Sequence, residues 1–137
     1  MSSSPSRDER GASFSTFVTA FTLVLILTAG LVIDGGAQMA AARRATVTAG
    51  EVARAASDAA ATRRLAGEDG TAAALAAAQQ RAAAASGMKV TSEIHDGVVH
   101  VEVRTSAPTV FLSIIGIEAL PAEGNAQADL FATGEHP

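Results

Sequence analysis

Cysteine, tryptophan and tyrosine are absent from this sequence of 137 residues. Without cysteine the chain can form neither the disulfides that often staple small exported domains nor a thiolate metal site or a thiol nucleophile. Aromatic side chains give the largest burial per residue, and here they are limited to five phenylalanines. Any part of the chain outside a membrane must therefore gain its order from helix packing, from membrane attachment or from partners.

Basic clusters are also scarce. From residue 34 onward acidic residues outnumber basic ones, and no basic cluster exceeds the pairs Arg43-Arg44 and Arg63-Arg64. A surface that tracks phosphates needs a concentration of Lys and Arg. The composition therefore predicts no nucleic-acid partner.

Catalytic and cofactor motifs are missing in the same way. The three histidines, His95, His100 and His136, are not spaced as metal ligands, which must converge in threes or fours. No serine lies in a Gly-x-Ser-x-Gly motif, and no glycine cluster forms a phosphate-binding loop. We therefore expect no catalytic residues, no metal, no cofactor and no enzymatic activity.

What the chain does have is an uncharged, apolar run that extends from residue 12 to residue 33. As a helix with a rise of 1.5 Å per residue it is about 33 Å long, enough to cross a hydrocarbon core of about 30 Å. We expect a transmembrane helix over 12–33, preceded by a cytoplasmic leader over 1–11. The alternative is a cleaved secretory signal with its cleavage site near residues 37–42. Basic residues flank the run on both sides, so charge does not assign its orientation.

An alanine-rich helical stalk is predicted over 34–87. Nearly half of the positions from 37 to 85 are alanine, which is the best helix former. Glycines predict a break at 67–70, followed by a second helix with Thr71 as its N-cap. Because alanine side chains are small, these helices have a thin apolar face. That face suits a plain spacer, or alternatively close lateral packing against neighbouring subunits.

A small β-rich head is predicted over 88–132, followed by a tail over 133–137. Asp96-Gly97 separates two alternating segments and is typical of a two-residue hairpin loop. This loop pairs Ile94 with Val99, Ser92 with Val101 and Val90 with Val103, so that every member of one face except the serine is apolar. A slip of one position would destroy that separation.

After the hairpin, a short apolar helix is predicted to start at Pro108 and to end by Pro121 and Gly124-Asn125. It either covers the apolar face of the hairpin or rests on the membrane surface. Residues 126–131 are predicted to form a last strand. The fold class is therefore α+β, with a transmembrane helix, a helical stalk and a small antiparallel head.

Asp34 ends the apolar run. It is either an interfacial charge that marks where water begins, or a specific contact with the helix or terminus of a neighbouring subunit.

Taken together, these segments resemble the TadE/TadG-like proteins of tight-adherence (Flp, type IVb) pilus systems, in the short form common in actinobacteria. The resemblance covers nearly the whole chain. It rests on a short leader ending in Arg10-Gly11, the apolar span, Gly30 to Gly36 (Gly-Leu-Val-Ile-Asp-Gly-Gly), Arg43-Arg44, the hairpin, and Pro108 with Phe111 to Ile117.

The resemblance implies a pilin-like, membrane-anchored minor pilin or pseudopilin that assists pilus assembly. Its N-terminus would be cytoplasmic and its C-terminal domain extracytoplasmic, and its partners would be lipid, pilin subunits and other assembly proteins. In related prepilins a membrane peptidase cuts after a glycine like Gly11, so that Ala12 becomes the first residue. Those prepilins carry a glutamate at the fifth mature position, where this chain has Thr16. The competing interpretation is a membrane-tethered extracytoplasmic binding or regulatory module unrelated to pili.

Overall fold

The computed structural model describes residues 9–130, with side chains from residue 13 onward. The fold is α+β, as predicted, and the predicted tail and most of the predicted leader lie outside the described residues. Its elements are α1 (Glu9–Leu65), α2 (Thr71–Ala83), β1 (Lys89–His95), β2 (Val98–Pro108), the short 3-10 helix η1 (Leu112–Ile115) and β3 (Ala119–Asp129).

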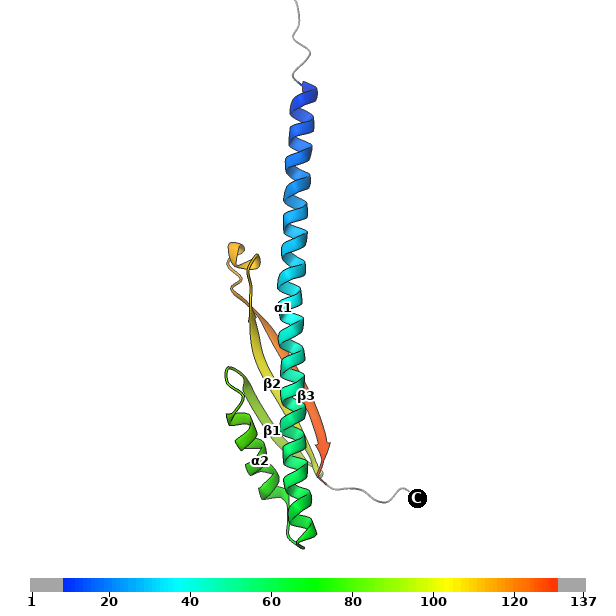
Figure 1. Cartoon of the computed structure of the whole chain (residues 1–137), viewed down its shortest axis with the longest axis vertical. Helices are drawn as coiled ribbons and strands as arrows, with labels where there is room; N and C mark the ends of the chain where they lie inside the picture. Colours follow the sequence, from blue (N-terminus) through cyan, green and yellow to red (C-terminus); the bar gives the residue numbers. More distant parts are fainter. Residues whose placement is uncertain (1–8, 131–137) are drawn as a thin grey trace, which may run out of the picture.

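α1 is a single helix of 57 residues that carries the apolar run in its N-terminal half (Figure 1). Within the described part of the chain it is the one helix long and apolar enough to cross a membrane. It begins at Glu9, just before the predicted span. The two glycines after Asp34 lie inside α1 and do not interrupt it.

The break predicted at 67–70 separates α1 from α2. Gly67 has the positive φ that suits a helix C-terminus. Thr71 is not the N-cap, contrary to the prediction. It is the first helical residue, and its amide and hydroxyl donate to the Asp69 carboxylate at 3.0 and 2.8 Å. The N-cap is Gly70, one position earlier than predicted, and it has no side chain to form a capping bond.

The hairpin register is confirmed residue by residue. Ile94 pairs with Val99, Ser92 with Val101 and Val90 with Val103. Asp96 and Gly97 both have positive φ, as a two-residue turn of this type requires. Val99, Val101 and Val103 of β2 are buried, whereas Glu93 and His100 on the other face are exposed.

The third strand is longer than predicted, and this corrects the prediction that Pro121 and Gly124-Asn125 end a helix. These residues lie inside β3, which pairs with β2 from Pro108↔Ala119 to Val98↔Asp129. β3 is an edge strand in the order β1-β2-β3. An edge strand tolerates proline because one side of its backbone has no partner strand. Pro108 likewise ends a strand and does not start a helix.

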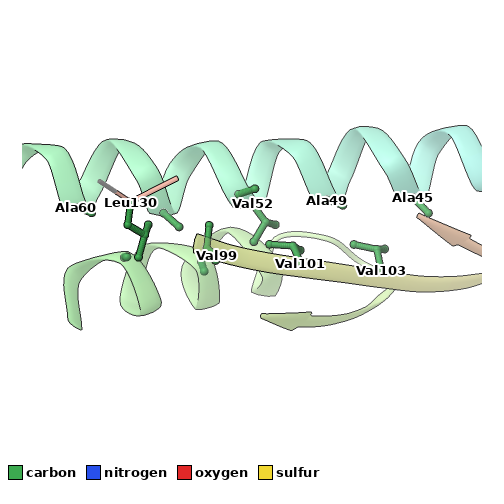
Figure 2. Packing of buried hydrophobic residues seen from close by; sticks show 12 residues of the cluster. Ala45, Ala49, Val52, Ala60, Val99, Val101, Val103 and Leu130 are labelled. Atoms are coloured by element: carbon green, nitrogen blue, oxygen red, sulfur yellow. The ribbon is translucent and has the colours of Figure 1, made fainter. Parts of the chain in front are cut away.

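The sheet lies beside the C-terminal half of α1 and not beyond its end (Figure 1). The predicted stalk is therefore not a bare spacer, because its alanine face is covered by the chain's own sheet and by α2. Figure 2 shows the valines of β2 pointing at this face. Its buried residues on α1 are Ala41, Ala45, Ala49, Val52, Ala53, Ala56 and Ala60.

Small residues let these backbones approach closely. A Cβ atom added to Gly124 of β3 would overlap with the backbone nitrogen of Thr46 in α1, so this position accepts no side chain. Near its two ends β3 is also tied to α1 by hydrogen bonds. The Gln38 side chain donates to the Pro121 carbonyl at 2.9 Å, and the Ser57 hydroxyl donates to the Asp129 carbonyl at 2.8 Å.

Candidate functional site

The predicted cleavage position lies near the start of α1. Gly11 and Ala12 are both helical, in the first turns after Glu9. At a rise of 1.5 Å per residue, Ala12 and Asp34 are about 33 Å apart along one helix. The two predicted sites are therefore at opposite ends of the apolar run, and cleavage after Gly11 stays a prediction.

Asp34 occupies a specific position where the apolar half of α1 meets the head. Its side chain is buried, with 1% of its surface exposed. One carboxylate oxygen accepts a hydrogen bond from the Val110 amide at 2.8 Å. The other accepts from the amides of Phe111 and Leu112 at 3.0 and 2.8 Å. The carboxylate thus holds three consecutive amides of the segment that joins β2 to β3.

These bonds favour the ionised carboxylate. The hydrogen bond from the Val110 amide is the largest influence and lowers the pKa of Asp34 below its ordinary value, and those from Leu112 and Phe111 act in the same direction. Burial opposes them by raising the pKa. The balance keeps Asp34 charged at neutral pH, where it can accept all three bonds.

Neither interpretation made from the sequence foresaw this contact. The Asp34 carboxylate is covered and bonded within its own chain, and a position where the apolar run meets water stays a prediction. A contact with a neighbouring subunit stays a prediction, and it would have to add to these bonds or replace them. Sequence reasoning missed the link because Asp34 and Val110 are 76 positions apart.

One turn before Asp34, Gly30 makes room for the same segment. A Cβ atom added to Gly30 would lie 2.5 Å from Cγ of Phe111, so the ring can rest on the helix only where a side chain is missing. Gly30 and Asp34 are one helical turn apart and share one face of the helix. The sequence signal that could have revealed the site is this pair, a small residue and a carboxylate on one face at the end of an apolar run.

The segment that they hold, residues 109–118, is here called the junction loop. It contains η1, which is followed by its C-cap, Gly116, in the left-handed conformation. Its apolar side chains are largely uncovered: Val110, Ile114 and Ile115 are 64, 81 and 71% exposed. The site therefore combines a buried charge with an exposed apolar surface.

A second feature lies on the outer face of the sheet. A shallow hollow of about 510 Å³ is lined mainly by polar residues of all three strands, among them Thr91, Glu93, His100, Glu102, Asn125 and Gln127. Glu93 and His100 are cross-strand partners there, as the hairpin register predicts. Over the part of the chain that the structure describes, no three acidic or histidine side chains gather as metal ligands.

Comparison of the chain with protein-family models, with curated proteins and with solved structures finds no match.

Proposed function

We propose that this chain is a membrane-anchored minor pilin or pseudopilin-like protein that assists assembly of a type IVb (Flp/Tad) pilus, with a structural and not a catalytic role. The observation that carries the proposal is α1 itself. One continuous helix projects a bare apolar half from a small domain that packs on its other half. Such a helix can remain in lipid or move into a bundle of like helices without refolding.

The exposed side chains of the apolar half support this exchange. Phe14, Leu23, Leu27 and Leu31 are each more than half exposed in the isolated chain. Lipid tails and the apolar surfaces of neighbouring helices are similar environments for these side chains. Moving the helix from lipid into a helical bundle therefore changes its hydrophobic free energy little. Subunit contacts in this proposal use residues 13–33 and the outward face of residues 34–65, because the chain's own head occupies the alanine face.

The proposal includes a topology. The N-terminus is cytoplasmic, where a prepilin-type peptidase can cut between Gly11 and Ala12, and the head lies outside the membrane on the opposite side. The partners are lipid, pilin subunits and other proteins of the assembly machinery. Thr16 stands where related prepilins have glutamate, so the proposed subunit contact does not depend on a carboxylate at that position.

Deletion of this chain from its native strain tests the role directly. We expect fewer surface pili by electron microscopy, with recovery when the wild-type chain is restored. A matched control is a chain in which residues 13–29 are replaced by an unrelated apolar sequence and Gly30 is kept, which preserves anchoring and loses specific helix contacts. Normal pili in the deletion strain would contradict the assembly role.

Because the chain lacks cysteine, every crosslink of a single-cysteine variant starts from the introduced position. Single cysteines at exposed Leu27 and at buried Ala49 should behave differently in native membranes. We expect Leu27→Cys to crosslink to a pilus component and Ala49→Cys, covered by the chain's own sheet, to remain uncrosslinked. Equal crosslinking at both positions would contradict the proposed arrangement.

The hollow on the outer sheet face favours a second candidate, a membrane-tethered binding or regulatory module. Its polar lining is suited to a protein segment or a small polar ligand, and it faces away from α1. Under this alternative, changing His100 and Gln127 to alanine abolishes the chain's function and leaves pilus number unchanged. Under the pilus proposal, the chain co-purifies with pilus assembly components, and the same two changes do not prevent it.

A further inference from the structure

The junction loop, residues 109–118, exposes an apolar surface that a water-facing loop rarely has. Val110, Ile114 and Ile115 are mostly exposed, and Ile117 is 42% exposed. The sequence has no charged residue from Thr105 to Ile117. Clustered apolar side chains on the surface of a monomer generally mark a contact with a protein, a ligand or a membrane.

The position of the junction loop along α1 indicates which contact this is. Phe111 rests on Gly30, which lies inside the apolar run and close to its end at Ile33. The helix between Gly30 and Ile33 rises by about 5 Å. The headgroup region on each side of a bilayer is roughly 5–8 Å thick. When residues 12–33 cross the hydrocarbon core, Phe111 therefore lies at its boundary.

The junction loop is held at this level from two directions. Asp34 accepts hydrogen bonds from the amides of Val110, Phe111 and Leu112. The strands on either side of the loop lie against the C-terminal half of α1, and Figure 1 shows the loop at the end of the sheet nearest the apolar half. The loop therefore cannot leave the level of the boundary without breaking these contacts.

Backbone amides of the junction loop are hydrogen-bonded within the protein, as a site with little water requires. Amides that lack partners are costly where water cannot reach them. Besides the three held by Asp34, the Thr109 amide donates to the Glu118 carbonyl at 3.0 Å and the Ile117 amide to the Leu112 carbonyl at 3.0 Å. Further bonds inside the loop satisfy the amides of Ile114 and Gly116 and the hydroxyls of Thr109 and Ser113.

From these observations we infer that the junction loop is a second membrane contact, with the side chains of Val110, Ile114 and Ile115 seated among the lipid headgroups and the first part of the acyl chains. The occupant of this apolar surface is the bilayer in which α1 lies. The inference rests on the membrane anchoring in the proposed function and is independent of any role in pili. Its consequence is that the head is attached at two points and keeps a fixed orientation to the membrane.

The chain has no tryptophan, so in nanodiscs built with a tryptophan-free scaffold protein one introduced tryptophan reports alone. The full chain is placed in nanodiscs at one copy per disc, with lipids brominated either near the headgroup or at the middle of the acyl chain, since bromine quenches tryptophan on contact. Three reporters are compared: Ile114→Trp in the junction loop, Leu23→Trp in the apolar run, and Leu65→Trp at the far end of α1, where Leu65 is 92% exposed.

We expect the Ile114→Trp reporter to be quenched strongly by lipid brominated near the headgroup and less by lipid brominated at mid-chain. The Leu23→Trp reporter should show the opposite order, and the Leu65→Trp reporter should be quenched by neither lipid. If Leu23→Trp is quenched and Ile114→Trp is not, the inference is overturned while anchoring stands. If neither is quenched, anchoring fails and the inference fails with it.

Tryptophan itself favours membrane interfaces, so a reporter without that preference is needed. Ile115→Cys carrying a nitroxide serves, since the chain has no other cysteine. We expect it to be more accessible to oxygen, which dissolves in lipid, than to a water-soluble nickel chelate, and His100→Cys on the outer sheet face to show the reverse. Equal access to the chelate at both positions would overturn the inference. A nitroxide at 115 that is shielded only when several copies share a disc would also overturn it, by assigning the loop to a second copy.

Discussion

The two halves of α1 belong to one continuous helix but expose different surfaces. Residues 13–33 carry large apolar side chains on every side, and Gly30 is the buried exception, covered by Phe111. Residues 35–65 bury one stripe of alanine with Val52 against the sheet and α2, and their charged residues lie outside this stripe. A helix that is apolar all round suits lipid, whereas a stripe of apolar residues suits packing against other elements in water.

Side-chain size distinguishes the two halves as much as polarity does. Alanine contributes little apolar area, but it lets a strand approach the helix backbone closely, as Gly124 does at Thr46. Leucine, isoleucine and phenylalanine in the other half would prevent such an approach, and they present a large apolar surface to lipid. The core of the head is therefore held by close contact of many small groups with a few valines and Leu130.

The largest expected effect comes from placing the same charge in each half. Leu23→Lys puts an ammonium near the middle of the apolar run and should cost about 3 kcal/mol of apparent insertion free energy. Val47→Lys lies on the exposed side of the other half, where Val47 is 62% exposed, and should leave insertion unchanged. A glycosylation-based insertion assay measures both. Similar losses in the two variants would mean that both halves face the same environment.

The close approach of β3 to the C-terminal half of α1 can be tested at Gly124. Gly124→Ala forces β3 away from the α1 backbone, and such overpacking should lower the free energy of unfolding by about 3 kcal/mol. Gly50→Ala is the matched control, since nothing lies within 4 Å of a Cβ atom at Gly50. It should stabilise α1 by up to about 1 kcal/mol. Hydrogen exchange of the β3 amides in detergent distinguishes the two, and unchanged protection in Gly124→Ala would disprove the close contact.

A smaller difference in the free energy of unfolding is expected between the buried stripe and the exposed side of residues 35–65. Val52→Ala removes two methyl groups from a fully buried site and should cost about 2 kcal/mol. Val47→Ala makes the same change at an exposed position of the same helix, and alanine is the better helix former there. We expect no loss in the second variant. Urea unfolding followed by hydrogen exchange in β2 measures the difference.

The smallest expected effect is a pH-dependent loss of amide protection in the junction loop, at the point where the two halves of α1 meet. The bonded amides lower the pKa of Asp34 in the folded chain relative to the unfolded chain, so ionised Asp34 stabilises the folded junction loop. This contribution is fully present above the unfolded pKa, near the ordinary value of 3.8, and is lost as pH falls through the lower, folded pKa. Exchange protection of the amides of residues 110–112 should therefore be constant from neutral pH down to about pH 4 and decline below it.

Asp34→Asn is the matched variant for this titration. Asparagine keeps one acceptor oxygen, whereas Asp34 uses both oxygens for its three bonds. We expect weaker protection of the amides of residues 110–112 that no longer depends on pH in the acidic range, with β1 and β2 unaffected. Equal pH dependence in wild type and variant would show that another group controls the loop.

Much of this fold could be predicted because its signals are local. The apolar run, the break at 67–70 and the hairpin register each depend on residues close together in sequence, and Asp96-Gly97 sets the pairing from Ile94 and Val99 outward. Apart from the N-cap assigned to Thr71, the errors occurred where a residue's role depends on a distant partner. Pro121 and Gly124 have the composition of a turn, but they lie in an edge strand whose glycine is required by α1.

By itself, the sequence determined the long helix, its change from large to small apolar side chains, and the alternation of β1 and β2, because helix propensity and side-chain periodicity act over short stretches of chain. Tertiary structure alone decided that the sheet lies along the alanine face, that β3 begins at Ala119, and that Asp34 binds three amides of the junction loop. These outcomes depend on which surfaces meet when the chain closes on itself. No local sequence pattern pairs a carboxylate with an amide so far away in the chain. The hydrogen bond between them becomes necessary only when packing removes both groups from water.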